Sequence, residues 1–374
     1  MKILVVGAGL SGCTVARLLH ERGHDVRIIE KSGRIGGLCV TNINEYGLKY
    51  EPFGARTFHT RDQKIIDFIT RFDSFNGYRH LKKMIIDGRI FPFPIHKEAI
   101  EGFKDSEIIF NELESRPKEI DKTNFETACI SVFGKTLYNY FIGNYTEKMW
   151  GMPPKNLTAE WAGKRLELRN DGSEGVFANQ WQGLPCNGYS FLLEKISKDI
   201  PVTLVCSKFN ENDYDIVIST APIDETMGFV FGRLPYRSFE FYYKNDESWE
   251  DETCGTINLP QHDTYIRKCN FKILHKQESA HNIIQYQKPI AADKNHVSMY
   301  PVNTPENNSI FDSYLKEICK TKNTVPVGRL ATYRYLDMDK AVSYAFDSIG
   351  LIENYLEMSP EQRYNEITKI RSKY

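Results

Sequence analysis

The sequence has 374 residues, enough for two or three domains, and its 13% aromatic content indicates cores built from bulky side chains. With a net charge of −1, the chain lacks the strong positive potential that would attract nucleic acid or an anionic membrane surface. No run approaches the ~18 consecutive apolar residues of a membrane span. The eight cysteines form no C-x-x-C pair and no metal spacing. We therefore expect no metal site, no signal peptide and a reduced, cytoplasmic protein, with the terminal KIRSKY as a solvated tail.

The first predicted unit is a strand, a tight turn and a helix in ILVVGAGLSGCTVARLL (3–19). Gly7 allows a sharp turn out of the strand, and Gly9 lets backbone N–H groups approach a pyrophosphate. Gly12 lets the helix pack close to the strand, with the helix N-terminus facing the phosphates. The stretch predicts a dinucleotide site, and the alternative is a purely structural turn.

A second strand and a glycine pair follow. HDVRIIE (24–30) ends in Glu30, an acid about twenty residues past the glycines, where it is expected to bind a ribose hydroxyl. The chain continues as KSGRIGGLC, with Lys31 and the pair Gly36 and Gly37. This segment resembles the FAD-binding two-dinucleotide fold, in which it lies along the ribose and the pyrophosphate. The alternative is a glycine-rich surface loop.

The middle of the chain changes its periodicity. Apolar residues at helical spacing predict helices over 97–116 and 127–145. Alternating apolar and polar residues over 75–96 and 231–321, as in RSFEFYYK and DTYIRKCNFKIL, predict an antiparallel sheet.

Three later segments are expected to return to the dinucleotide domain. PVTLVC (201–206) and YDIVISTAP (214–222) are predicted to be paired strands. NTVPVGRLATYRYLD (323–337) and the periodic segment 338–356 predict a late strand, a loop and a last helix. The positive N-terminus of that helix would point at a flavin.

The predicted fold class is α/β. An FAD-binding Rossmann-like domain of the two-dinucleotide type is interleaved with a helical domain and an antiparallel β-sheet domain. The FAD-binding domain is expected over 1–74, 185–230 and 322–374, the helical domain with a mobile substrate loop over 97–184, and the sheet domain over 75–96 and 231–321.

Five short stretches outside the dinucleotide unit occur in one order along the chain. They are GARTFHT (54–60), YTEKMWG (145–151), PYRSFEF (235–241), MYPVN (299–303) and GRLATYRYLDM (328–338). In this order, and with the N-terminal glycines, they closely resemble the UDP-galactopyranose mutase family over essentially the whole chain. The element YTEK-W-G is the most specific of them.

The resemblance implies the activity of that family. Its members bind FAD and convert a nucleotide-linked hexopyranose into the furanose, here most simply UDP-galactopyranose into UDP-galactofuranose for a cell-surface polysaccharide. The flavin is active when reduced: its N5 forms a covalent adduct with C1 of the sugar, expels the nucleotide diphosphate and later takes part in its return. The expected partner is a nucleotide-diphosphate sugar, and the expected assembly is a homodimer without nucleic acid or a membrane span.

The resemblance also implies roles for individual residues. A leaving diphosphate must be held beside the flavin, and arginine suits this because its fork binds phosphate oxygens in pairs. Arg165 and Arg267 match the two phosphate arginines, and His59 matches a histidine beside the flavin. The other catalytic matches are Tyr300, Tyr335 and Asp337. The cofactor-binding matches are Gly7, Gly9, Ser11, Gly12, Glu30, Lys31, Gly37, Gly328, Arg329, Asp337 and Met338. The substrate-binding matches are Arg56, His80, Tyr145, Thr146, Trp150, Arg165, Arg237, Arg267, Tyr300 and Tyr335.

Three of these matches form the expected subsite for the nucleotide base. Tyr145 and Trp150 would stack on the pyrimidine, and Thr146 would read its edge. The alternative is the end of a helix whose two aromatic residues pack inward. Arg237 matches an arginine in the same region, although an isolated arginine is more often a surface residue.

Three positions depart from the family. It usually has histidine, asparagine and tyrosine where this chain has Arg56, His80 and Val176, all toward the sugar or the mobile loop. The continuation KCNFKIL after Arg267 also replaces an acid- and histidine-rich strand. We therefore expect an altered hexose subsite, for galactose, for UDP-N-acetylgalactosamine or for a dTDP-6-deoxyhexose such as dTDP-fucose. Neutral drift around plain galactose is the alternative.

Two other classes of protein stay open. A flavin oxidase of the amine oxidase type shares the FAD fold but has no reason to carry two phosphate arginines with YTEK-W-G. An inactive nucleotide-sugar binding protein has no reason to keep His59 and the whole flavin fingerprint. Thermal protection by UDP would separate the mutase from the oxidase.

Overall fold

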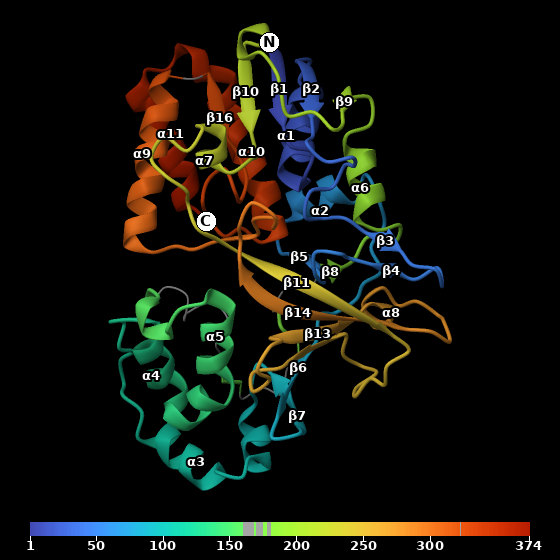
Figure 1. The fold of residues 1–374 in the computed structure, drawn as a ribbon, viewed down its shortest axis with the longest axis vertical. Coiled ribbons are helices and arrows are strands. Elements are labelled where there is room, and N and C mark those ends of the chain that lie inside the picture. Colours follow the sequence, from blue (N-terminus) through green and yellow to red (C-terminus); the bar gives the residue numbers. More distant parts are fainter. Residues whose placement is uncertain (160–167, 170–174, 178–180, 322) are drawn as a thin grey trace.

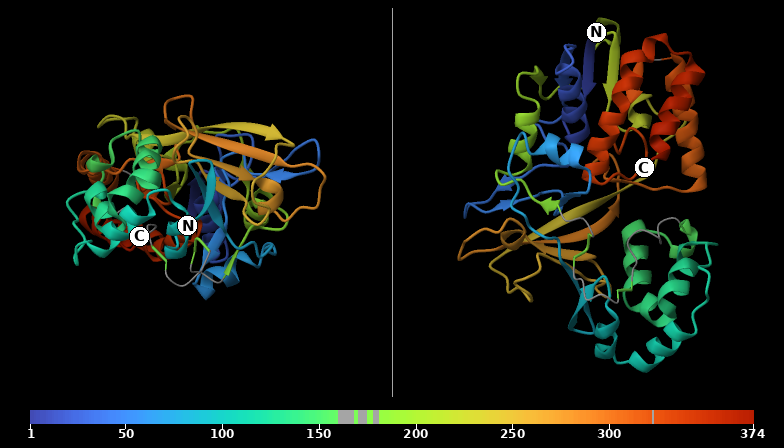
Figure 2. Two further views of the ribbon diagram at one scale, coloured as in Figure 1. Left: turned by 90° about the horizontal axis from the view of Figure 1, so that it is seen from below. Right: turned by 180° about the vertical axis from the view of Figure 1, so that it is seen from behind.

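The computed structural model describes the chain except residues 160–167, 170–174, 178–180 and 322. Figure 1 shows three regions along the long axis: a parallel sheet with its helices at one end, a group of helices at the other, and a second sheet between them. The view from behind in Figure 2 shows the same arrangement, with the N-terminus at the outer end of the parallel sheet. The predicted α/β class with interleaved parallel and antiparallel sheets is confirmed.

Five parallel strands form the first sheet, in the order β16-β10-β1-β2-β9. Successive residues of a strand point to opposite faces. Ile3 and Val5 accordingly lie in the main core, whereas Leu4 packs in a smaller cluster with Ile29 and Val217. The strands are β1 (Lys2–Val6), β2 (Asp25–Ile29), β9 (Val202–Thr203), β10 (Ile216–Ser219) and β16 (Thr324–Pro326).

Helices cover the main-core face of this sheet. Helix α1 packs against α10, α10 against α11, and α11 against α9. The helices of this region are α1 (Leu10–His20), α2 (Gln63–Ile69), α6 (Tyr189–Ile196), α7 (Ile223–Thr226), α9 (Pro305–Thr321), α10 (Met338–Asn354) and α11 (Pro360–Ser372), with 3₁₀ turns η5 (Glu211–Asp213) and η6 (Tyr355–Glu357).

Seven strands form the second sheet, in the order β15-β11-β14-β13-β12-β6-β7. All neighbours pair antiparallel except β12 and β6, which are parallel; the hairpin β6–β7 comes from an earlier part of the chain. The strands are β6 (Lys82–Ile86), β7 (Arg89–Phe93), β11 (Tyr236–Asn245), β12 (Thr256–Asn258), β13 (Arg267–Asn270), β14 (Ile283–Ala291) and β15 (Tyr300–Pro301). Two small ladders add β3 (Asn42–Ile43) with β4 (Lys49–Tyr50), and β5 (Phe58–Thr60) with β8 (Trp181–Gly183).

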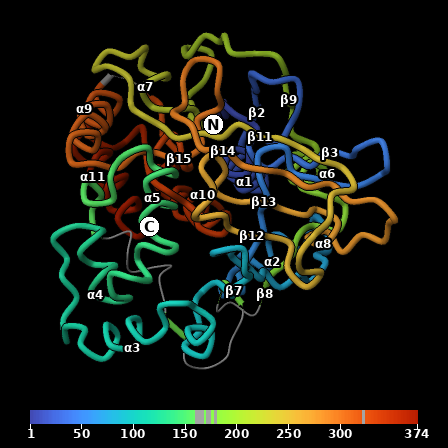
Figure 3. Tube along the Cα trace, turned by 60° about the horizontal axis from the view of Figure 1, so that its bottom comes forward, coloured from blue at the N-terminus to red at the C-terminus, as the bar shows by residue number. Residues whose placement is uncertain are grey.

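The third region is helical and has its own core, which it shares with the hairpin β6–β7. The helix expected over 127–145 is interrupted: Gly134 has a φ of 76°, and a π-turn separates two α-helices. The elements are η1 (Lys97–Gly102), α3 (Ser106–Glu114), α4 (Phe125–Leu137), the π-turn η2 (Tyr138–Ile142), α5 (Gly143–Trp150) and η3 (Pro154–Asn156). Figure 3 shows these helices grouped beside the ends of the second sheet.

Several sequence predictions need correction. The strands β9 and β10 do not pair with each other, because β9 joins β2 at one edge and β10 lies between β1 and β16. The segment NFKIL is not a strand: it contains the short helix α8 (Phe271–Leu274). Helix α10 is not the last helix, because α11 follows it.

The terminal KIRSKY is part of α11 and not a solvated tail. Ile370 is buried, and Arg371 donates from Nε to the carbonyl oxygen of Thr332 at 2.8 Å. Helix α9 was expected with the sheet domain, but it packs on α11 and α7. The domain limits otherwise remain a prediction.

Candidate active site

A cavity of about 1750 Å³ opens at the carboxyl ends of β1, β2 and β10. It exceeds the ~300–1,000 Å³ of a site for a drug-sized ligand, as a dinucleotide requires. The structure brings eleven of the predicted residues together on its wall: Gly7, Gly9, Ser11, Gly12, Glu30, Lys31, Gly37, Arg56, Gly328, Arg329 and Met338.

The glycines of the cavity have different reasons to be glycine. A Cβ on Gly12 would lie 2.0 Å from the carbonyl oxygen of Gly7, so no side chain fits between helix and strand. A Cβ on Gly9 would meet nothing closer than the Cα of Gly37 at 3.8 Å. The protein itself therefore tolerates a side chain at Gly9, and the bare backbone there leaves room for a ligand to approach.

The start of α1 is arranged for an anion. Gly9 is its N-cap, no side chain caps the helix, and its first turn carries no acidic residue. The first N–H groups of the helix are therefore left for a phosphate, which the helix dipole also favours. At the end of β2, the buried carboxylate of Glu30 accepts N–H groups from Ala8 and Ser32, both at 2.8 Å. These bonds orient the carboxylate toward the cavity and leave lone pairs for ribose hydroxyls.

The start of α10 lies at the same cavity. Asp337 is its N-cap without a side-chain cap bond, and Met338 lines the wall. Gly328 has a φ of 92°, and a Cβ there would lie 2.6 Å from Oγ of Ser11. The loop after β16 thus packs directly on the first turn of α1, and together these residues fit an FAD.

Arg267 is the central residue of a second group, on the antiparallel sheet. Its Nη2 donates to the hydroxyl oxygen of Tyr145. Its Nε is enclosed without a hydrogen-bond partner, and no carboxylate of the described residues forms an ion pair with it. Enclosing an unbalanced cation is costly, and an anionic ligand would offset that cost.

Two tyrosines lie beside this arginine. Tyr300 and Tyr335 stack with ring centroids 5.8 Å apart and planes inclined by 13°. The Tyr335 hydroxyl donates to Asp337 at 2.7 Å. The guanidinium of Arg329 lies 5.4 Å and 4.9 Å from the two ring centroids, and Arg329 also lines the large cavity. Arg329 therefore connects the flavin cavity to the group around Arg267.

The expected base subsite lies on α5. Tyr145 and Trp150 pack beside the buried cluster of Met149 and Phe239, and Thr146 is buried. The hydroxyl of Tyr145 accepts a hydrogen bond from Arg267.

The comparisons with known proteins agree with this geometry. The family model described as UDP-galactopyranose mutase matches residues 140–335, and an NAD(P)-binding Rossmann-like domain matches residues 5–72. A probable UDP-galactopyranose mutase of Klebsiella pneumoniae is 30% identical over 373 residues, which cover 95% of this chain and 97% of that protein. The chain belongs to the UDP-galactopyranose mutase family. It is a flavin-dependent sugar mutase, an isomerase whose cofactor is FAD.

Two further relatives bear on substrate and fold. The dTDP-fucopyranose mutase of Escherichia coli is 29% identical over 371 residues, covering 94% of this chain and 98% of that protein. A crystal structure of reduced UDP-galactopyranose mutase superposes with a TM-score of 0.77 at 18% identity, covering 99% of this chain and 98% of that one. That structure supports the fold of this mutase.

Arg237 has a different environment in this mutase from the one expected. It lies on β11 and is buried, and it donates from Nε to the carbonyl oxygen of Met149 at 2.7 Å and from Nη2 to that of Lys148 at 3.1 Å. These are carbonyl groups at the end of α5, which lack partners within the helix. Its hydrogen bonds therefore go to the backbone of the helix that carries Tyr145.

His59 lies on β5 and stacks on Phe177, with centroids 3.5 Å apart. Asp339, in the first turn of α10, faces the same place: burial raises the pKa of its carboxyl, and His59 partly offsets this. Oδ1 of Asp339 has no hydrogen-bond partner among the described residues. Sequence reasoning missed Phe177 and Asp339, because neither belongs to a motif and only the fold brings them to His59.

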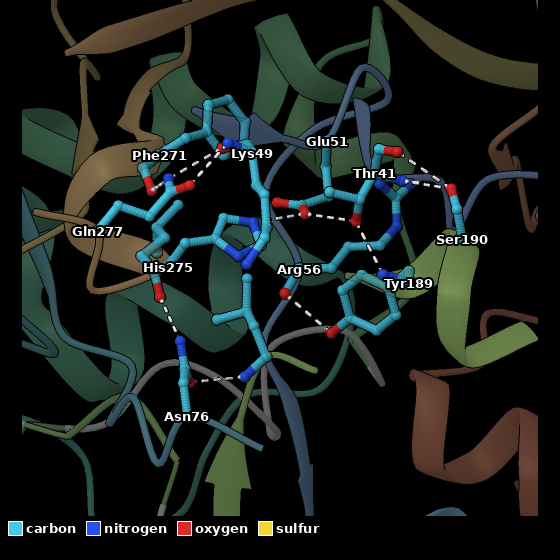
Figure 4. A network of polar contacts seen from close by, with 12 residues as sticks. Thr41, Lys49, Glu51, Arg56, Asn76, Tyr189, Ser190, Phe271, His275 and Gln277 are labelled. Carbon is cyan, nitrogen blue, oxygen red and sulfur yellow. Dashed lines mark hydrogen bonds and ion pairs between the residues drawn. The ribbon is translucent and has the colours of Figure 1, made fainter. Parts of the chain in front are cut away.

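Arg56 lies on the flavin cavity, in a loop held by a buried polar network (Figure 4). Its backbone carbonyl accepts the hydroxyl of Tyr189 at 3.1 Å. Five residues upstream, the buried Glu51 pairs with His275 at 2.8 Å and accepts the hydroxyl of Thr41 at 3.1 Å. Nη1 of Arg56 bonds backbone carbonyls of its own loop, so its remaining donors are left for the cavity.

His80 does not line this cavity. It is buried, with Nδ1 within 3.2 Å of the Thr57 hydroxyl, and its ring stacks on Phe177 at 5.5 Å. The backbone N–H of Val176 donates to the carbonyl oxygen of His80 at 3.0 Å. The positions of His80 and Val176, two of the three family departures, are therefore in direct contact. Arg165 lies outside the described residues.

Proposed function

We propose that this mutase interconverts the pyranose and furanose forms of a nucleotide-linked hexose, with UDP-galactopyranose as the first candidate substrate. The observation that carries the proposal is Arg267. It is a cation without a carboxylate partner among the described residues, its Nε is enclosed and unpaired, and it touches Tyr145 of the expected base subsite. The diphosphate that links the nucleotide to the sugar would supply the missing anion.

The residues of the chain then have distinct tasks. Arg267 binds the diphosphate, holds it while it is detached from the sugar, and so keeps it available for return. The hydroxyl of Tyr300, which bonds to no described residue, adds a neutral donor next to it. Tyr335 is oriented by its bond to Asp337, and Arg329 brings a second positive charge to the boundary with the flavin cavity. When bound and reduced, the flavin supplies the nucleophile for the sugar.

A dTDP-6-deoxyhexose is the second candidate substrate, with UDP-N-acetylgalactosamine as a further possibility. The dTDP-fucopyranose mutase of Escherichia coli matches nearly the whole chain as well as the UDP-galactopyranose mutases do. Arg56, where the family usually has histidine, supports a changed set of donors at the cavity.

The test is a panel of nucleotide sugars incubated with the dithionite-reduced protein, with the products separated by chromatography. We expect a furanose product from one member of the panel, and none without the reductant. Equal turnover with and without reductant would contradict the mechanism. Heat protection by UDP or dTDP would oppose an ordinary flavin oxidase, which has no site for either.

We also propose a cytoplasmic homodimer that supplies a furanose for a cell-surface polysaccharide. The family resemblance supports this, and no helix of the described residues is long and apolar enough to cross a membrane. Light scattering coupled to gel filtration measures the assembly directly. A monomer at micromolar concentration would contradict the dimer.

A further inference from the structure

Lys148 of the YTEKMWG element has a task that the mutase chemistry does not explain. It lies on α5, and its ammonium reaches the loop between β12 and β13. Nζ donates to the carbonyl oxygens of Leu259 at 3.0 Å, Pro260 at 3.1 Å and Tyr265 at 3.3 Å, and also to that of His262. An ammonium has three protons, so four carbonyl oxygens enclose and share them.

The carbonyl oxygens are the direct partners of the Lys148 charge. Among the described residues no carboxylate forms an ion pair with it, although Asp263, on the same loop, interacts with it electrostatically. Burial lowers the pKa of Lys148 to about 8. Holding a half-buried ammonium in place costs solvation free energy and side-chain entropy. A lysine without a structural task would therefore extend into solvent.

The contact joins two segments that meet at the nucleotide subsite. Tyr265, which provides the last carbonyl oxygen of the cage, lies two residues before Arg267, and Lys148 lies three residues after Tyr145 on α5. Arg237 reinforces the same junction from β11 by binding the carbonyl oxygens of Lys148 and Met149. Helix α5 also packs on β14.

We propose that Lys148 is a positioning residue for the nucleotide diphosphate: its carbonyl cage docks α5 on the sheet and thereby sets the contact between Tyr145 and Arg267. The inference rests on the proposed function, because it takes that contact as part of the substrate site. Lys148 is not among the residues that line the flavin cavity, so it should govern affinity for the nucleotide and leave the chemical step nearly unchanged.

The experiment compares Lys148→Met with Lys155→Met in the FAD-loaded, full-length protein. Methionine keeps the length of the side chain without its donors, and Lys155 is an exposed lysine of the same helical region. We expect Lys148→Met to raise the Kd for UDP and the KM of the nucleotide sugar by roughly 10- to 100-fold, the range for lost charged hydrogen bonds. The FAD content and kcat, within about threefold, should match the control.

A double-mutant cycle tests the route of the effect. Tyr145→Phe removes the hydroxyl that Arg267 binds, so the loss of affinity from Lys148→Met should be much smaller in that background. Fully additive losses would overturn the proposal. If Lys148→Met fails to retain FAD, Lys148→Gln takes its place, because it keeps two donors; we expect a threefold to tenfold rise in Kd.

The outcomes separate the two proposals. A Kd for UDP within twofold of wild type in both Lys148 variants would overturn the positioning role and leave the proposed function intact. A wild-type protein that binds neither UDP nor dTDP would overturn the proposed function, and with it this role for Lys148. Equal losses in kcat and affinity would mean that Lys148 supports the fold and not the subsite.

Discussion

The flavin cavity and the nucleotide subsite are built from different materials. The part of the cavity wall at the start of α1 consists of glycines, backbone N–H groups and the carboxylate of Glu30, and it comes from the first 37 residues. The nucleotide subsite consists of side chains on α5, β11, β13, β15 and the loop before α10, which are up to 190 residues apart in the sequence. Its charged members, Arg267, Arg237 and Lys148, form no ion pair with a carboxylate of the described residues.

This difference separates two ways of binding a phosphate. The backbone at α1 offers fixed N–H groups and a dipole, which cost nothing to orient once the helix has formed. The subsite around Arg267 must hold a full charge in place, so neighbouring residues such as Tyr145 are needed to orient it. A permanently bound cofactor suits the first kind of site, and a substrate that is released and recaptured suits the second.

The largest test of the comparison is at the glycines of the flavin cavity. Gly12→Ala should abolish FAD binding and activity, because its Cβ would lie 2.0 Å from a backbone oxygen that cannot move away. Gly9→Val should also lose FAD, but with an unchanged fold, since the protein leaves that position open. Flavin absorbance and far-UV circular dichroism measure the two effects.

Gly33→Ala is the matched control, because a Cβ there meets nothing within 4 Å. It should keep FAD and full activity. Normal flavin content in Gly9→Val would mean that the pyrophosphate does not lie at this position. It would also contradict the role given to backbone groups in binding the cofactor.

The second test removes the side-chain cation. Arg267→Ala should keep FAD but lower kcat/KM by roughly 30- to 1000-fold, since one charge-assisted phosphate contact contributes about 2–4 kcal/mol in the transition state. Arg165→Ala, outside the described residues, is expected to behave alike. Steady-state kinetics with reduced enzyme measure both, and activities within threefold of wild type would contradict the diphosphate site.

The third test measures how alkaline pH changes the stability of the folded protein through its buried thiols. Burial raises the pKa of the Cys13 and Cys129 thiols to about 12 and that of Cys254 and Cys319 to about 11. The unfolded chain ionises these thiols near pH 8.5, so above that pH the folded protein binds more protons and loses stability as pH rises. We expect a loss on the order of 1–2 kcal/mol per thiol by pH 10.

Melting temperatures between pH 7 and pH 10 measure this loss. Cys13→Ala should flatten the alkaline slope, although it lowers the melting temperature at pH 7 by opening a small cavity. A slope that does not change in Cys13→Ala would show that other groups cause the alkaline loss.

The smallest expected effect concerns specificity. Arg56→His with His80→Asn should shift relative kcat/KM toward UDP-galactopyranose by about threefold to tenfold, because a pocket that bonds one substituent discriminates against sugars without it. The ratio is measured against UDP-N-acetylgalactosamine and a dTDP-6-deoxyhexose. Since Arg56 lines the cavity and His80 is packed behind Phe177, the single variant Arg56→His should carry most of the shift.

If the kcat/KM ratio does not change and the wild type already prefers galactose, the departures at Arg56 and His80 have no effect on substrate specificity. That result would also mean that the flavin cavity and the nucleotide subsite are both those of an ordinary member of the family.

The sequence by itself determined the units whose conformation is local. The order of strand, glycines and helix predicts β1, α1 and β2 correctly, because a turn between Gly7 and Gly12 and the two periodicities leave few alternatives. The family could also be recognised from its ordered motifs. Helix and strand were assigned correctly over most of 97–145 and 231–245 for the same local reason.

The tertiary structure alone decided which of many possible partners each group meets. No feature of the local sequence determines whether β9 pairs with β2 or with β10. Both β9 and β10 are short apolar strands, and the same sheet could accommodate either pairing. Arginine and lysine side chains are long and bind any carbonyl or phosphate within reach. Whether Arg237 binds a phosphate or the end of α5, and whether Lys148 faces solvent or a cage of carbonyl groups, therefore depends on where the packed core places their backbones.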